Sequence, residues 1–422
     1  MWKVGNCSRR IIIIFYKTGQ LSGFFVGWNS LDPKGGSSKL FSNFAAMKKV
    51  YLDNASTTAL RPEVIGTMTR VLEEDYGNPS STHSFGRTAK VILETSRKTI
   101  AKLVGAASQE IIFTSGGTEA NNWILNSAVK DLKVTRIISS RIEHHAVLHP
   151  LEVLEREGKV KVAYVDLKPN GEINLTHLTA LLSDNIPTLV SLMHVNNETG
   201  TVLDLALTGR ICHQYNAYFH SDTVQSVGKF PFDLHNLPVD FIVASAHKFH
   251  GPKGIGFVYI NKKANIQPML FGGEQEKGLR PGTEALHNIA GMAKALELSY
   301  SALAIEKEAI GDLKEYLKAQ VGLHFPGSTI NGEHADSFYN IINILFPFSA
   351  EKTAMILFHL DMKGIAVSRG SACQSGSIRP SHVLKEILSE EDLKKPSLRI
   401  SFSHYNTRED IDLLITALQS IA

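Results

Sequence analysis

Short runs of β-branched and apolar residues alternate along this chain with longer stretches in which apolar residues recur every three or four positions. Helical patterns of this kind include residues 89–104, 118–129 and 146–157. The apolar runs predict seven strands, at residues 111–114, 136–139, 161–165, 188–193, 217–221, 241–244 and 256–259. Such alternation is typical of an α/β domain with a mainly parallel sheet.

The pattern changes after about residue 305, where strands and helices no longer alternate regularly. We therefore predict a large domain at residues 61–305 and a smaller α+β domain formed by residues 47–60 and 306–422. The elements predicted for the smaller domain are helices at 306–320 and 350–362, a strand at 340–346, a Gly/Ser-rich turn at 368–377 and a helical tail from residue 407.

Residues 1–46 differ from the rest in charge, because they contain six Lys or Arg residues and a single acidic residue, Asp32. An acid-poor basic leader is a feature of transit peptides. However, Met47 directly precedes the first patterned strand, at residues 49–52, and is a natural start. We favour a mis-assigned start or a disordered leader.

The net charge of +3 is too small to indicate a nucleic-acid or anionic-membrane partner. No apolar run approaches the length of a membrane span. Three cysteines, Cys7, Cys212 and Cys373, form neither a disulfide framework nor a metal-binding pattern. Cys212 lies in a helical pattern and is expected to be buried. A reducing compartment, the cytoplasm, is the expected location.

A candidate anion site follows the strand at residues 111–114, where Gly116 and Gly117 open a helix and Thr118 adds a hydroxyl donor. Backbone N–H groups and the helix dipole at such a turn favour a bound phosphate. Taken alone, this pattern is about as typical of a tight turn that needs glycine.

Two charged residues follow neighbouring predicted strands. Asp222 comes after the strand at 217–221, and Lys248 comes shortly after the strand at 241–244. Open α/β sheets bind ligands at the carboxyl ends of their strands. Lys248 is therefore a candidate Schiff-base amine, although a surface lysine is the plainer interpretation when it is taken alone. Lys253 keeps the surface interpretation.

Together these residues resemble the class V aminotransferases, a family of pyridoxal-phosphate enzymes of fold type I, and among them the cysteine desulfurases. The resemblance extends from about Val50 to the end of the chain. It rests on five blocks in the order of the family, at residues 51–58, 76–81, 143–144, 194–200 and 280–283.

The resemblance implies that Lys248 holds pyridoxal 5′-phosphate as a Schiff base and then acts as a base on the substrate. Asp222 would pair with the pyridinium nitrogen, Gln225 would bind the ring hydroxyl, and His144 would stack on the ring. Residues implied for the cofactor phosphate are Gly117, Thr118, Ser245 and His247. Thr283 would reach the phosphate of a second subunit, which implies a homodimer.

The resemblance also implies the nucleophile. Cys373 lies in the Gly/Ser-rich turn, matches the loop cysteine of the desulfurases, and would attack the sulfur of L-cysteine to form a persulfide with release of L-alanine. Arg399 would bind the substrate carboxylate, and Asn197 would assist near the substrate and the ring hydroxyl. The length of the loop resembles the branch that passes sulfur to an acceptor protein, such as an iron–sulfur scaffold or a sulfur carrier.

Three alternatives stay open from the sequence. One is a selenocysteine lyase or another class V enzyme with the same cofactor site. The second is a cysteine hydrolase that uses Cys373 with a histidine, and the third is a catalytically silent sulfur carrier. Because the sequence ends at Ala422, soon after the last helical pattern, we do not expect scaffold docking through a long tail.

Overall fold

The computed structural model describes residues 12–17, 20–25, 48–333, 337–369 and 380–421, the first two segments as backbone only. It separates into two compact units, Met1–Lys48 and Lys49–Ala422. In the first unit, β1 (Ile12–Lys17) pairs antiparallel with β2 (Gln20–Phe25). That residues 1–46 are a leader stays a prediction.

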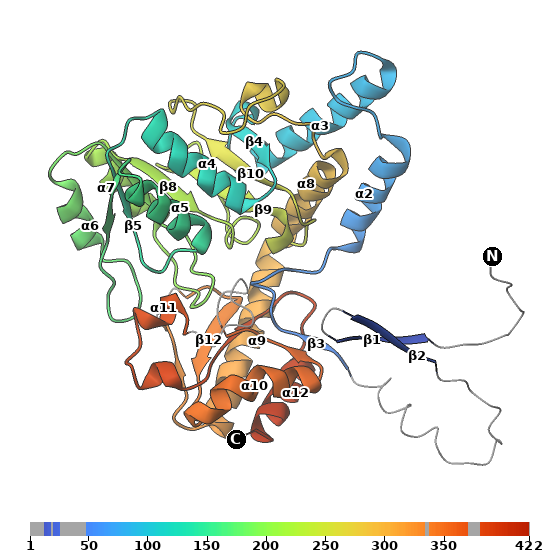
Figure 1. Cartoon of the computed structure of the whole chain (residues 1–422), viewed down its shortest axis with the longest axis vertical. Coiled ribbons are helices and arrows are strands. Elements are labelled where there is room, and N and C mark those ends of the chain that lie inside the picture. Colours follow the sequence, from blue (N-terminus) through green and yellow to red (C-terminus); the bar gives the residue numbers. More distant parts are fainter. Residues whose placement is uncertain (1–11, 18–19, 26–47, 334–336, 370–379, 422) are drawn as a thin grey trace, which may run out of the picture. The chain divides into compact units, whose positions relative to one another are not determined.

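The second unit contains a seven-stranded sheet in the order β4-β10-β9-β8-β7-β5-β6 (Figure 1). Only β10 runs antiparallel to its neighbours, so the mainly parallel sheet predicted from the sequence is confirmed. The strands are β4 (Ile111–Thr114), β5 (Arg136–Ser139), β6 (Lys161–Tyr164), β7 (Thr188–Ser191), β8 (Tyr218–Asp222), β9 (Phe241–Ser245) and β10 (Gly256–Ile260).

This sheet is buried on both faces, as its continuous apolar strands require. Ile137 and Leu189 belong to one apolar layer, while Ile138 and Val190 belong to the other. α4 (Gly117–Lys130) and α5 (His145–Arg156) pack in the first layer. The other helices around the sheet are α2 (Pro62–Glu74), α3 (Ser84–Leu103), α6 (Leu175–Leu182), α7 (Leu205–Gln214) and α8 (Leu286–Ser301).

A smaller antiparallel sheet follows in the order β11-β12-β14, and β13 pairs separately with β3. Its apolar core is distinct from that of the large sheet and includes Leu52, Phe346 and Leu398. The elements are β3 (Val50–Tyr51), β11 (Thr329–Ile330), β12 (Ile341–Leu345), β13 (Ile365–Ala366), β14 (Ser397–Ser401), α9 (Leu303–His324), α10 (Ala350–Met362), α11 (His382–Lys385) and α12 (Arg408–Gln419).

The helices predicted beyond residue 305 are present, and α10 has the predicted bounds. β14 is a strand that the apolar pattern does not predict, because its five residues, Ser-Leu-Arg-Ile-Ser, contain only two apolar positions. All five are nevertheless buried. Among the residues described here, no helix is both long enough and apolar enough to cross a membrane.

Candidate active site

A cavity of about 560 Å³ lies where the carboxyl ends of β8 and β9 meet the first turn of α4. Asp222 is the last residue of β8, and Ser245 is the last residue of β9. The two strands are parallel neighbours, so both residues reach the same edge of the sheet. The predicted residues that line this cavity are Gly117, Thr118, His144, Asn197, Asp222, Gln225, Ser245, His247, Lys248 and Arg399.

The first turn of α4 forms one wall of the cavity. Its N-cap, Gly116, provides no side-chain cap and has φ of 151° and ψ of −174°, a conformation that essentially only glycine adopts. A Cβ atom on Gly117 would lie 2.6 Å from Cγ2 of Val224, so the backbone approaches this neighbour closely. The N–H groups of this turn and the helix dipole suit an anion such as a phosphate.

The Lys248 amine lies in the short helix η2 (Ala246–Lys248), directly after β9. Its Nζ donates hydrogen bonds to the carbonyl oxygens of Ala55 (2.6 Å) and Ser56 (2.8 Å). Burial, together with the nearby Lys248 and Lys253 charges, lowers the pKa of His247 to about 3. His247 is therefore neutral at pH 7 and offers an anion a hydrogen bond and no charge.

The Asp222 carboxylate is 7% exposed and is held by two donors. Oδ2 accepts a hydrogen bond from Nδ2 of Asn121 (2.7 Å), and Oδ1 accepts one from the backbone N–H of Val224 (3.0 Å). Asn121 was not among the residues predicted from the sequence. It lies four positions after Gly117, so helical periodicity alone places it on the same face of α4.

Gln225 and Asn197 line the cavity from the segments that follow β8 and β7. Nε2 of Gln225 donates to the Ala55 carbonyl (2.9 Å). Its Oε1 is buried and makes no hydrogen bond within the described part of the chain. This oxygen is available to accept a hydrogen bond from a ligand hydroxyl.

His144 is both the N-cap of α5 and a wall of the cavity. Its Nδ1 accepts a hydrogen bond from the N–H of Ala146 (3.0 Å), which leaves the ring proton on Nε2. Burial lowers the pKa of His144, although the Asp222 charge opposes this shift. A neutral ring with a fixed tautomer is suited to stacking on an aromatic cofactor.

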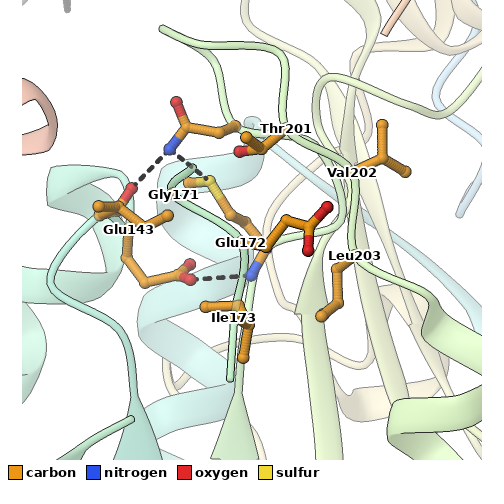
Figure 2. A pocket seen from close by; sticks show the side chains of 10 residues that line it. Glu143, Gly171, Glu172, Ile173, Thr201, Val202 and Leu203 are labelled. Atoms are coloured by element: carbon orange, nitrogen blue, oxygen red, sulfur yellow. Dashed lines mark hydrogen bonds between the residues drawn. The ribbon is translucent and has the colours of Figure 1, made fainter. Parts of the chain in front are cut away.

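Next to His144, the Glu143 carboxyl is buried and lies outside the main cavity. Its Oε1 accepts hydrogen bonds from the Met193 N–H and the Ser140 hydroxyl, both 2.9 Å long. Burial raises the pKa of Glu143 to about 8. Figure 2 shows this side chain beside a separate cavity of about 20 Å³, which is large enough for about one water molecule.

Arg399 lies on β14 and is 1% exposed. Nη1 donates to the Asn197 carbonyl (2.8 Å), while Nη2 donates to Asp53 Oδ1 (2.7 Å) and Ser56 Oγ (2.6 Å). The guanidinium therefore lies in the cavity wall with its charge balanced by Asp53. The substrate-binding role of Arg399 stays a prediction.

Among the described residues, one predicted site residue does not line this cavity. Thr283 is exposed and is not part of its lining. The nearby Arg280 pairs with Glu119 of α4 at 2.8 Å. Cys373 lies outside the described residues.

The burial of Cys212 and the exposure of Lys253 agree with the sequence predictions. Cys212 is buried in α7, as predicted, and burial raises the pKa of its thiol well above the usual range. Lys253 is exposed, as predicted, although it also lines the edge of the cavity.

The family model for class V aminotransferases matches residues 50–414, which include the three sheets of the second unit. The chain belongs to the class V aminotransferase family. Its cofactor is therefore pyridoxal 5′-phosphate. The first turn of α4, the buried Asp222 carboxylate and the Lys248 amine line one cavity and fit this cofactor.

Relatives of this class V chain include the cysteine desulfurase IscS of Dictyoglomus turgidum, 42% identical over 89% of this chain and 94% of the relative. The putative cysteine desulfurase IscS 1 of Bacillus subtilis is 41% identical over 86% and 96%. Among solved structures, a NifS-like protein has a TM-score of 0.81 at 35% identity and covers 89% of this chain and 99% of its own. SspA in complex with cysteine has a TM-score of 0.74 at 30% identity, over 85% and 100%.

Proposed function

We propose that this protein is a cysteine desulfurase, which uses pyridoxal phosphate to convert L-cysteine to L-alanine and transfers the sulfur to Cys373 as a persulfide. One observation carries the proposal: the Lys248 amine, the Asp222 carboxylate and the first turn of α4 line a single cavity. The cysteine desulfurases among the relatives support the choice of reaction within the family.

The cavity offers a group for each part of the cofactor. Gly117, Thr118, Ser245 and His247 would bind the phosphate, and the buried Asp222 carboxylate would pair with the ring nitrogen. The open Oε1 of Gln225 would accept the ring hydroxyl, and the neutral His144 ring would stack on the cofactor. When bound, pyridoxal phosphate supplies an electron sink for the electron pair left at the substrate α-carbon.

Lys248 would release the Ala55 and Ser56 carbonyls to reach the cofactor, and its amine would then remove the proton from the substrate α-carbon. The substrate carboxylate would replace one of the present hydrogen-bond partners of Arg399, and Asn197 would lie beside it. The Cys373 thiolate attacks the substrate sulfur, so that an S–S bond forms as the C–S bond breaks. A proton delivered to the β-carbon and a proton returned to the α-carbon complete L-alanine.

We also propose that the enzyme is a cytoplasmic homodimer that passes sulfur to an iron–sulfur scaffold or another sulfur carrier. Thr283 supports the dimer, because it is exposed and absent from the lining of its own cavity. The ion pair between Arg280 and Glu119 anchors this segment to α4, beside the turn proposed for the phosphate.

The test is a visible spectrum of the purified protein before and after L-cysteine, with alanine release and persulfide mapping by peptide mass. Cys373→Ser should keep the cofactor colour and lose the persulfide, whereas the control Cys212→Ala should keep both. Alanine release at the parental rate from Cys373→Ser would show that the nucleophile is assigned wrongly. A strong preference for selenocysteine would favour the lyase, and activity after complete cofactor removal would favour a cysteine hydrolase.

A further inference from the structure

Asn121 makes a buried side-chain contact that the proposed function does not use. It is 1% exposed, and its Nδ2 lies 2.7 Å from Oδ2 of Asp222. The amide must face the carboxylate with its nitrogen, because two acceptor oxygens at this distance would repel each other. The Asn121 Oδ1 is buried and makes no hydrogen bond among the described residues, so the contact with Asp222 accounts for how this side chain is placed.

We propose that Asn121 is a positioning residue that holds the Asp222 carboxylate in the orientation and ionised form needed to pair with the ring nitrogen of pyridoxal phosphate. The proposal rests on the role of Asp222 in the proposed function. Together, Asn121 and the Val224 N–H provide one donor for each carboxylate oxygen. The carboxylate is thereby fixed at both oxygens before the cofactor binds.

The position of Asn121 on α4 gives this contact a second consequence. Gly117 and Asn121 are one helical turn apart, on the same face of α4. Gly117 also lies against Val224, which contributes the second donor to Asp222. A single rigid helix therefore presents its N-terminus to the cofactor phosphate and its second turn to the counter-ion of the ring nitrogen. The separation of these two groups is set by helix geometry.

The energetic reason is the cost of burying a charged group. A hydrogen bond donated to a carboxylate stabilises its ionised form, and the effect grows where water is excluded. If Asn121 is replaced by a residue without a donor, one buried oxygen of Asp222 loses its partner. The proton shared between Asp222 and the ring nitrogen should then move toward the carboxylate, and the ring nitrogen should lose part of its positive charge.

The test uses holoenzyme reconstituted with pyridoxal phosphate that carries ¹⁵N in the ring. Asn121→Leu removes the donor at similar volume, and Asn121→Ser is a milder second variant. Asn122→Ala is the matched control, because Asn122 lies on the same helix, its side chain donates to the Thr118 carbonyl and it does not line the cavity. The ring-nitrogen chemical shift is followed between pH 6 and 9, together with the cofactor dissociation constant and the unfolding temperature.

Both Asn121 variants should move the nitrogen signal toward that of unprotonated pyridine, and Asn121→Leu should weaken cofactor binding about 10- to 100-fold, the range for a hydrogen bond to a charged group. The Asn122 control should match the parent. A parental nitrogen signal in both variants overturns the proposal, even if their unfolding temperatures fall, since Asn121 would then have only a structural role. Asp222→Asn is the reference: if it too leaves the signal unchanged, the role assigned to Asp222 in the proposed function fails.

Discussion

Lys229 provides a sharp test of the electrostatics around the site. It follows β8, is 8% exposed, and its Nζ is buried with no hydrogen bond to any described residue. The Nζ lies 5.7 Å from the ring centroid of Phe338. Burial, with a smaller contribution from the Lys248 charge, lowers the pKa of Lys229 from 10.5 to about 7. We predict that Lys229→Met stabilises the protein, and more strongly at low pH.

The sign follows from proton binding. Between about pH 7 and pH 10.5 the unfolded chain holds the Lys229 proton more tightly than the folded chain does, so the free energy of unfolding rises with pH in this window. At 1.36 kcal/mol per pKa unit, burying this amine costs about 5 kcal/mol at pH 6, and still about 2 kcal/mol at pH 9, where the amine loses its proton on folding. The gain from Lys229→Met should therefore shrink by about 3 kcal/mol between pH 6 and pH 9.

The measurement is urea unfolding of the parent and the Lys229→Met holoenzyme at pH 6, 7.5 and 9. Taking the difference between the two proteins at each pH cancels the titration of the other groups. Lys363→Met, at an exposed position, is the control and should show a small difference that does not depend on pH. A gain that is equal at pH 6 and pH 9, or a loss at pH 6, would show that the amine is charged and solvated in the folded protein.

Two further changes have expected outcomes. Arg97 and Glu276 form a buried ion pair (2.6 Å, both side chains 2% exposed), so Arg97→Met leaves Glu276 without this partner. The free energy of unfolding, measured in urea, should fall by about 3–5 kcal/mol. The control Lys159→Met removes one partner of an exposed ion pair and should lower it by less than about 1 kcal/mol. Equal losses would contradict the burial argument. Gly117→Ala places a Cβ 2.6 Å from Val224 and should weaken cofactor binding at least about tenfold in a spectroscopic titration, since α4 must shift. Unchanged affinity would show that the turn does not contact the phosphate.

The sheet was predictable because its strands are short, fully buried and apolar. β4 and β5 have the predicted bounds, and every residue in both is buried. The strand that carries Asp222 was less clear, because the predicted strand ended at Ser221, whereas β8 includes Asp222. That Asp222 and Lys248 line one cavity was predictable too, since adjacent parallel strands present their carboxyl ends at one edge of the sheet.

The contacts that position these groups were not predictable from local pattern. Asn121 lies three residues after Thr118 of the predicted anion site, yet nothing in a helical sequence says which buried carboxylate an asparagine will contact. Ala55 and Ser56 contribute backbone carbonyl oxygens, and since every residue has one, the sequence does not identify which of them are used. Such contacts join residues more than 100 positions apart, and they depend on how the elements pack.

Ser56 connects two of the groups proposed for the reaction. Its carbonyl oxygen accepts a hydrogen bond from the Lys248 amine, and its hydroxyl accepts one from Nη2 of Arg399. Asp53, three residues earlier, holds the same Arg399 nitrogen. In the proposed function, a substrate carboxylate at Arg399 would compete with Asp53 and Ser56 for the guanidinium. The proposed function therefore predicts that a substrate carboxylate at Arg399 loosens residues 53–56, which also hold the Lys248 amine.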